Sequence, residues 1–205
     1  HLAAQSTVNQ KIKKKTYELN NIQSTKNLIF LMDELKIKKI IFSSTASVYD
    51  KSNFLIKEDY KIQPISNYGI SKFSAEKLIK KNKNINHIIL RFFNVAGCVE
   101  NPLTGEFHNP ETHLIPISVN RAISKKKLNI FGNDYLTKDG TCVRDYVHIK
   151  DICSAIKSSI KYLNKRKSVI LNIGNGEGVS NKDVILNLNN YFEYKILINY
   201  LNKRK

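Results

Sequence analysis

A run of apolar residues at 39–44, KIIFSS, most constrains how this chain can fold. The run is rich in β-branched residues and is bounded by polar sequence. Such a run is typical of a strand that is buried on both faces, as in a parallel sheet covered by helices. The segment therefore predicts a parallel strand in an α/β fold.

Helical and strand-like patterns alternate along the rest of the chain. The helical patterns cover 17–35, 67–82, 114–126, 149–164 and 181–192. The strand-like runs cover 39–44, 87–93, 128–131, 168–173 and 195–200. The stretch 133–143 predicts a turn-rich hairpin around Asp139-Gly140, and Ser180 with Asp183 predicts a capping box for the last helix.

Tyr68 and Lys72 are the candidate catalytic pair, because residues four apart share one face of a helix. A free tyrosine titrates near 10, so it acts as a base at neutral pH only if a neighbour stabilises its phenolate, as a lysine ammonium can. This spacing alone equally describes a solvated helix face. The hydroxyl residues Ser43, Ser44 and Thr45, which end the preceding strand, favour the functional interpretation.

Several ordered segments resemble the extended short-chain dehydrogenase/reductases and, within them, the UDP-glucose 4-epimerase family. They are HLAAQSTV at 1–8, YELNNIQSTKNLI at 17–29, FSSTASVYD at 42–50, PISNYGISK at 64–72, LRFFNVAG at 90–97, HLIP at 113–116, IFGNDYLTKDGTCVRDYVHIKDI at 130–152 and LNIGNGEGVSNKDVI at 171–185. Their order and spacing make a chance match very improbable.

The resemblance implies the second half of a Rossmann-type parallel sheet plus most of a smaller α/β substrate domain. Residues 1–95 would belong to the NAD-binding domain, with elements of about 140–175 returning to it, and 96–205 mostly to the nucleotide-sugar domain. The glycine-rich βα turn that cradles a dinucleotide is not found here. Gly174 to Gly178 follow a strand-like run but sit too late in the chain, so an ordinary turn is favoured. We therefore expect a truncated fragment that is poorly stable and inactive alone.

The resemblance also implies an activity, the interconversion of UDP-galactose and UDP-glucose. Tyr68 would take the proton of the sugar 4-hydroxyl while C4 transiently gives its hydride to NAD. Lys72 would lower the pKa of Tyr68 and bond the nicotinamide ribose, and Thr45 would bond the 4-oxygen. NAD supplies the redox chemistry, and the protein orients it.

The resemblance also implies further binding residues, each assigned by its matching position in the family pattern. The expected cofactor-binding residues are Leu2, Ala3, Ala4, Asn20, Ser43, Tyr68, Lys72 and Phe93. The expected substrate-binding residues are Thr45, Asn94, His113, Leu114, Asn129, Phe131 and Arg144. Ser6 stands where some members have a lysine, and His113 stands where many have an asparagine. Arg144 suits a phosphate, although an ion pair with Asp145 or Asp151 is an alternative.

Three alternatives differ in their chemistry. A nucleotide-sugar 4,6-dehydratase needs an Asp-Glu pair directly after the strand-end hydroxyl, where this chain has Ala46 and Ser47. A UDP-glucuronate decarboxylase is disfavoured because the segment 133–146 resembles the epimerases. A non-catalytic or degraded protein is disfavoured because Thr45, Tyr68 and Lys72 are all present.

The composition limits the kinds of partner that we expect this chain to bind. The net charge of +17 invites a nucleic-acid hypothesis, but the lysines are scattered and no basic helix or RNA-binding motif is found. No apolar run reaches the ~18 residues of a membrane span. Cys98, Cys142 and Cys153 lack metal-ligand spacing, and His148 has no partner at ligand spacing, so we expect reduced cytoplasmic cysteines and no metal site. A homodimer through helices that include 67–82 is implied by the resemblance.

Overall fold

The computed structural model describes residues 1–7, 12–52, 54–99, 104–106, 108–165 and 168–203. The chain divides into two compact units. The first comprises 1–93 and 151–173, and the second comprises 94–150 and 174–205. Each unit is described by itself.

The first unit is built on a parallel sheet with the strand order β1-β2-β6. Strand β1 (Lys39–Thr45) pairs with β2 (Asn86–Phe92), which pairs with β6 (Val169–Ile173). Ile41 lies opposite Ile88, and Ile88 opposite Val169. The predicted strands 39–44, 87–93 and 168–173 are therefore present within a residue of their expected bounds.

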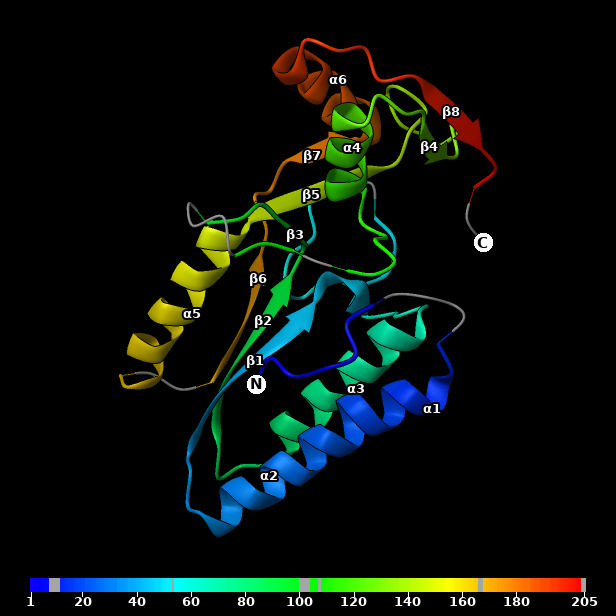
Figure 1. The fold of residues 1–205 in the computed structure, drawn as a ribbon. Coiled ribbons are helices and arrows are strands. Elements are labelled where there is room, and N and C mark those ends of the chain that lie inside the picture. The colour runs from blue at the N-terminus through cyan, green and yellow to red at the C-terminus, as the bar shows by residue number, and fades with distance from the viewer. Residues whose placement is uncertain (8–11, 53, 100–103, 107, 166–167, 204–205) are drawn as a thin grey trace. The chain divides into compact units, whose positions relative to one another are not determined.

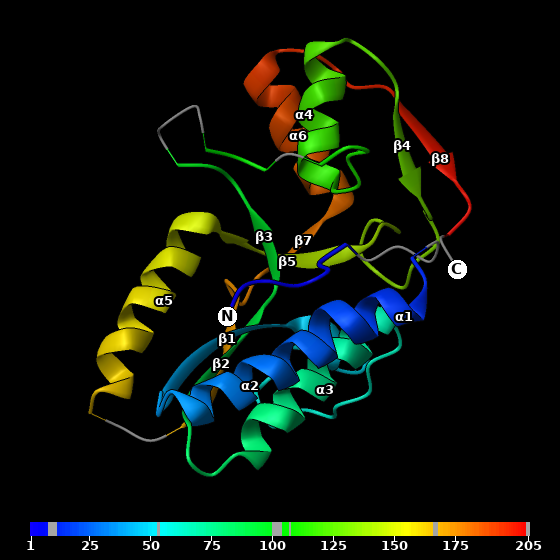
Figure 2. The ribbon, with the colours of Figure 1, turned by 60° about the horizontal axis from the view of Figure 1, so that its bottom comes forward.

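Helices cover both faces of this sheet (Figure 1; Figure 2). On one face, α2 (Ser24–Glu34) and α3 (Asn67–Lys81) pack on β1 and β2. On the other face, α5 (Ile149–Leu163) packs on β2 and β6. The cluster under α2 and α3 contains Met32, Ile40, Phe42, Ala75, Ile79, Ile85 and Ile89. Burial on both faces explains why the sequences of β1 and β2 are nearly continuous apolar runs.

The predicted helix 17–35 is a longer helical stretch with a local irregularity. It consists of α1 (Lys14–Tyr17), a π-helical segment η1 (Glu18–Gln23) and α2. Asn21 lies in η1 and is buried, with 2% of its surface exposed. π-Helical turns inside α-helices are frequent at functional sites, and this one directs a polar side chain into the core.

The described residues of the second unit form two small sheets. Strand β3 (Asn94–Ala96) pairs in parallel with β5 (Val143–His148), which pairs antiparallel with β7 (Gly178–Ser180). Strand β4 (Leu128–Phe131) pairs in parallel with β8 (Ile198–Leu201). The helices α4 (Leu114–Ile123) and α6 (Asn181–Phe192) share a core with β4 that contains Ala122, Leu128, Ile130, Ile185 and Ile196.

The hairpin predicted for 133–143 is wrong, because β4 pairs with β8 and β5 pairs with β3 and β7. The turn itself is present. The Tyr135 N–H donates to the Gly140 carbonyl at 2.9 Å, and Gly140 has φ +77°. A turn signal predicts a change of direction, whereas the strand pairing depends on distant residues.

The capping box at the start of α6 is confirmed. The Asp183 N–H donates to Ser180 Oγ at 3.0 Å, and the Ser180 N–H donates to the Asp183 carboxylate at 3.1 Å. Ser180 Oγ also donates to Asp139 at 2.5 Å, which ties the helix start to the preceding turn.

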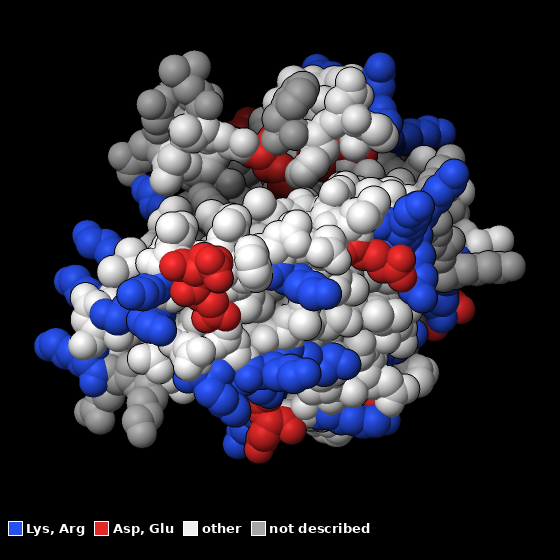
Figure 3. Space-filling view, turned by 90° about the horizontal axis from the view of Figure 1, so that it is seen from below, with Lys and Arg blue, Asp and Glu red and all other residues white. Residues whose placement is uncertain are grey.

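Surface charge is distributed rather than concentrated on the face seen in Figure 3. Lys and Arg form short clusters there, separated by neutral surface and by Asp and Glu. The basic residues are thus scattered on this face, as they are along the sequence. No helix in the described part of the chain is both long enough and apolar enough to cross a bilayer.

Candidate active site

Thr45 lies at the carboxyl end of β1, where polar groups of a parallel sheet commonly face a ligand. Its side chain is 8% exposed and accepts a hydrogen bond from the Ser47 N–H at 3.1 Å. That bond caps the short 3₁₀ turn Ala46–Val48. The turn ends the strand and fixes the direction of the Thr45 hydroxyl.

Tyr68 and Lys72 lie on successive turns of α3, as the sequence predicts. The helix begins after Ser66, whose hydroxyl accepts from the Gly69 N–H at 3.0 Å. The Tyr68 phenol and the Thr45 hydroxyl lie close enough to interact, and this interaction favours the phenolate. The candidate base and the strand-end hydroxyl are therefore neighbours.

Gly69 allows this contact, and sequence reasoning missed its role. A Cβ on Gly69 would lie 2.3 Å from the Ser47 carbonyl oxygen, far inside van der Waals contact. Only glycine lets the first turn of α3 approach the backbone after Thr45 so closely. The sequence feature that could have indicated this role is Gly69 itself, which directly follows Tyr68.

The electrostatics of Tyr68 differ from the expectation. Burial raises the pKa of Tyr68, the hydrogen bond with Thr45 lowers it, and the nearby Tyr17 raises it, so the pKa lies above its usual value of 10.0. The expected lowering of the Tyr68 pKa by Lys72 is therefore not found in this arrangement. Thr45 is the side chain that favours the phenolate.

Lys72 is buried, with 2% of its surface exposed, and its Nζ lies 4.3 Å from the centre of the Phe42 ring. Burial lowers the pKa of Lys72 to about 8, although the charge of Glu76 opposes this shift. A desolvated ammonium on an aromatic face is a strong donor for a hydroxyl or anionic partner. This property fits the contact with a cofactor ribose that was expected for Lys72.

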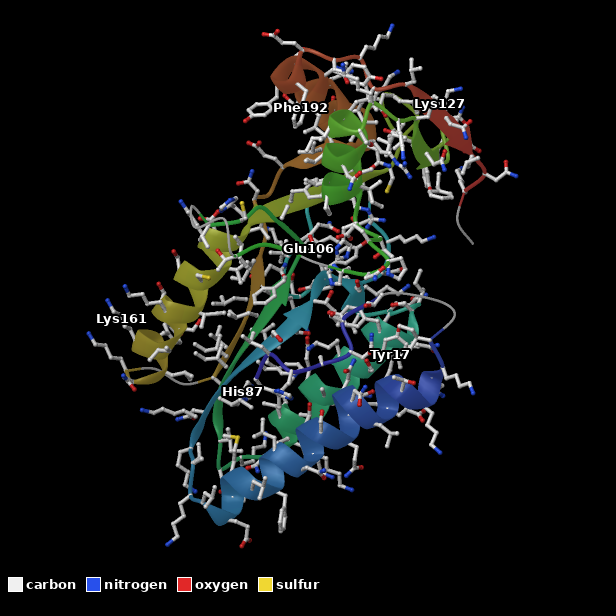
Figure 4. The ribbon with its side chains drawn as sticks, viewed as in Figure 1. Tyr17, His87, Glu106, Lys127, Lys161 and Phe192 are labelled. Carbon is white, nitrogen blue, oxygen red and sulfur yellow. The ribbon has the colours of Figure 1, made fainter. Side chains whose placement is uncertain are left out.

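The segment 1–7 is fastened to the helical stretch by Asn21 and Tyr17. The Gln5 N–H donates to Asn21 Oδ1 at 2.7 Å, and Asn21 Nδ2 donates to the Gln5 carbonyl at 3.1 Å and to Ser71 Oγ at 2.8 Å. The Tyr17 hydroxyl, labelled in Figure 4, donates to the Thr7 carbonyl at 2.6 Å. These bonds hold the segment with the predicted cofactor contacts Leu2, Ala3 and Ala4.

Asn20, predicted to face the cofactor, is exposed, whereas Asn21 is buried. The Asn21 side chain bonds Gln5 and Ser71, and the cofactor contact of Asn20 stays a prediction. The residue pair Asn20-Asn21 left the choice ambiguous in the sequence, and the π-helical turn decides which of them points inward.

Two further predicted cofactor contacts lie near strand ends. Ser43 Oγ donates to the His1 carbonyl at 3.1 Å, and the Ser43 N–H donates to the same oxygen at 3.2 Å. The Phe93 N–H donates to the Ile173 carbonyl at 3.0 Å. Phe93 is half-buried directly after β2.

A buried polar network beside the pair was also missed by sequence reasoning. Arg91 on β2 donates twice to Glu76 on α3, and Ser44 Oγ donates to the same carboxylate. Arg91 also donates to the Tyr49 hydroxyl at 2.8 Å, which donates to Asn172 at 2.6 Å. The network ties together β1, β2, β6 and the helix that carries Tyr68.

The remaining predicted site residues lie in the second unit. Asn94 on β3 donates from Nδ2 to the Asp145 carbonyl at 3.0 Å. Asn129 on β4 accepts from Asn199 at 3.0 Å, and Phe131 follows it on the same strand. His113 and Leu114 begin α4.

Arg144 is exposed on β5, and among the described ion pairs it has none with Asp145. The Asp145 carboxylate instead accepts from the N–H groups of Asn175 at 2.7 Å and Gly176 at 2.9 Å. The glycine-rich turn therefore directs these N–H groups to a carboxylate of the chain itself. This agrees with its interpretation as a structural turn.

The comparisons with known proteins define the class of this chain. Residues 1–174 match the NAD dependent epimerase/dehydratase family, and the chain belongs to that family. It is 39% identical over 192 residues to a UDP-glucose 4-epimerase of Halalkalibacterium halodurans, covering 90% of this chain and 58% of the relative. It is 34% identical over 212 residues to a UDP-glucose 4-epimerase of Rhizobium meliloti, covering 100% of this chain and 65% of the relative.

Solved structures agree with this family. The UDP-glucose 4-epimerase of Brucella ovis in complex with NAD matches with a TM-score of 0.92 at 29% identity, covering 98% of this chain and 64% of that chain. The enzyme of Bifidobacterium longum in complex with NAD+ and UDP matches with a TM-score of 0.89 at 31% identity, covering 98% and 63%. The predicted α/β class is confirmed. The chain spans 58–65% of the length of these relatives.

Proposed function

We propose that the full-length protein interconverts UDP-galactose and UDP-glucose. The observation that carries this proposal is the contact between Tyr68 and Thr45 beside the buried Lys72, in a chain similar to UDP-glucose 4-epimerases along its whole length. The first unit would hold NAD, and the second would hold the UDP-sugar.

In the proposed mechanism, Tyr68 takes the proton from the sugar 4-hydroxyl and later returns it. Thr45 donates a hydrogen bond to the same 4-oxygen and orients it toward Tyr68. NAD, when bound, supplies the redox chemistry at C4. Lys72 orients the cofactor ribose, and Thr45 is the side chain that favours the phenolate.

The turn after Thr45 supports an epimerase over a dehydratase. Elimination of water across C5–C6 requires an acid and a base next to the strand-end hydroxyl. Ala46 and Ser47 occupy those positions, and the Ser47 N–H is engaged by Thr45. Neither side chain can serve as a carboxylic acid or a carboxylate base.

A homodimer is part of the proposal. Phe30, Leu31 and Leu35, on α2 and at its C-terminal end, are 63%, 52% and 68% exposed. An apolar patch of this kind on a helix that packs beside α3 suits association with a second copy. Light scattering of the full-length protein should give twice the chain mass, and Phe30→Glu should give one chain mass.

The experiment that tests the activity uses the full-length protein with UDP-galactose, followed by ¹H NMR. UDP-glucose should form, and Tyr68→Phe should reduce its rate by at least a hundredfold. Tyr191→Phe is the matched control, because Tyr191 is 80% exposed and outside the site. A folded, NAD-containing protein that leaves UDP-galactose unchanged would refute this substrate assignment.

A further inference from the structure

Two histidines and two glutamates converge within one short segment of the second unit. The segment contains Glu106, labelled in Figure 4, His108, Glu111 and His113. One potential ligand atom from each residue lies within 4.8 Å of all the others. The residues follow the spacing E-x-H-x-x-E-x-H, which the prediction of no metal site did not take into account.

Both imidazoles present the same nitrogen to the carboxylates. His108 Nδ1 lies 3.1 Å from Glu106 Oε1 and 3.7 Å from Glu111 Oε2. His113 Nδ1 contacts Glu106 Oε1 and lies 3.9 Å from Glu111 Oε1. The two rings stand edge to face with centres 5.2 Å apart. The nitrogens and oxygens therefore point into one common space.

His108 Nδ1 is an unsatisfied atom at the centre of this arrangement. Within the described part of the chain it is shielded from solvent and has no hydrogen-bond partner, because its contact with Glu106 lacks hydrogen-bond geometry. A shielded polar atom without a partner is costly and calls for an explanation such as an unseen ion. A cation held between the nitrogen and the carboxylates would satisfy it.

The backbone prepares Glu111 for this role. Glu111 Oε1 accepts from the N–H groups of Thr112 at 2.7 Å and His113 at 2.9 Å. These two hydrogen bonds orient the carboxylate, as the outer hydrogen bonds of metal ligands generally do.

We propose that Glu106, His108, Glu111 and His113 bind one divalent transition-metal ion, with zinc the best match. Zinc takes imidazole nitrogens at about 2.0–2.1 Å and carboxylate oxygens at about 2.0–2.2 Å. Tetrahedral ligands at those lengths are about 3.4 Å apart. The contacts of His108 Nδ1 at 3.1 and 3.7 Å lie on either side of this value, whereas His113 Nδ1 lies closer to Glu106 and would move away from it on metal binding. Two imidazoles disfavour Mg²⁺ and Ca²⁺, which take oxygen ligands.

The rival explanation is a metal-free cluster in which protonated histidines bond to Glu106. The two explanations differ in what zinc does. The site takes up zinc at neutral pH and releases protons on binding, whereas a charge cluster has no affinity for the metal. The inference shares His113 with the predicted substrate contacts, and its test therefore measures metal uptake rather than activity.

The test is a zinc titration of metal-free full-length protein in competition with a chromophoric chelator at pH 7.5. Wild type is expected to take up one equivalent. Glu106→Gln combined with His108→Asn is expected to weaken zinc binding at least a hundredfold. His148→Asn is the matched control, since His148 lies in the same unit outside the cluster and contacts Gly97. Equal zinc affinity in the double variant and wild type, or no uptake by wild type, would overturn the proposal.

Two further measurements test the same site without relying on the double variant. Cobalt substitution reports the ligands, because thiolate ligation by Cys98, Cys142 or Cys153 gives an intense near-ultraviolet band that a nitrogen and oxygen site lacks. Such a band would overturn the assignment. In ¹⁵N-labelled wild type, zinc should shift the Nδ1 resonances of His108 and His113 and leave those of His87 and His148 unchanged. Unchanged His108 and His113 resonances would contradict the site even if the double variant fails to fold.

Discussion

Glu76 and Arg91 form a buried, two-pronged ion pair between α3 and β2. Arg91 Nε lies 3.0 Å from Oε1 and Nη2 lies 2.7 Å from Oε2, and the two side chains are 3% or less exposed. The same carboxylate accepts from Ser44, next to Thr45. The pair therefore fixes the helix that carries Tyr68 and Lys72 against the strand that carries Thr45.

Removal of one partner of this pair should be strongly destabilising. Arg91→Ala leaves the Glu76 charge buried without its main partner, so we expect a loss of roughly 3–5 kcal/mol in the free energy of unfolding. Asp134→Asn, which breaks the exposed pair with Lys203, should cost about 0–1 kcal/mol. Urea unfolding of the full-length protein measures both. A loss below 1 kcal/mol for Arg91→Ala would show that the network is not structural.

The lowered pKa of Lys72 gives stability a defined pH dependence. The folded-state pKa of about 8 lies below the unfolded value near 10.4, so the unfolded chain holds this proton more tightly. Burying the ammonium therefore costs stability below pH 8, and the cost disappears as the pH rises from about 8 to above 10.

The substitution Lys72→Met should remove this cost. The variant should exceed wild type by up to about 3 kcal/mol in unfolding free energy at pH 7, and the difference should shrink by pH 10. Lys77→Met on the exposed side of the same helix is the control, with a pH-independent difference. A Lys72→Met difference that does not change with pH would contradict the lowered pKa.

Gly69→Ala tests the close approach of α3 to the turn after Thr45. The added methyl group would meet the Ser47 carbonyl, so the helix must shift and the contact of Tyr68 with Thr45 must lengthen. We expect a loss of about 1–3 kcal/mol in stability and a fall in kcat greater than any change in KM. Gly105→Ala is the control, because the added methyl group would lie 3.8 Å from its nearest neighbour, Cys98 Cβ. If Gly69→Ala kept the wild-type kcat, the close approach of α3 to the turn after Thr45 would not require glycine at this position.

Asn21→Ala and Asn20→Ala discriminate the two asparagines at the predicted cofactor site. Asn21→Ala leaves the Gln5 backbone groups without their partner, at about 1–3 kcal/mol. We expect NAD affinity of the full-length protein to fall about tenfold or more in Asn21→Ala and to stay within about twofold in Asn20→Ala. Titration with NAD, followed by nucleotide fluorescence, measures both affinities. A larger loss of affinity in Asn20→Ala than in Asn21→Ala would instead support Asn20 as the cofactor contact.

The long elements of the fold were predictable because their patterns are local. The apolar run of β1, the amphipathic pattern of α3 and the capping box of α6 each depend on neighbouring residues. The short strands β3, β5 and β7 were not predicted, because they exist through pairing with distant segments. The π-helical segment was also not predicted, because its sequence is compatible with an ordinary α-helix.

The candidate site was predictable only in part. Tyr68, Lys72 and Thr45 belong to contiguous motifs, which made them visible in the sequence. Glu76 and Arg91 are partners only because α3 packs against β2, and no local pattern indicates that pairing. The pKa of Tyr68 likewise depends on burial, which spacing does not encode.

The most direct test of the central claim follows deuterium at C4. The full-length protein is incubated with UDP-galactose deuterated at C4, and the product is analysed by NMR. Transient oxidation at C4 with return of the same hydride predicts UDP-glucose that retains deuterium at C4, and no turnover by Tyr68→Phe. A product that has lost its C4 deuterium to solvent, or a 6-deoxy-4-keto product, would contradict the proposed reaction.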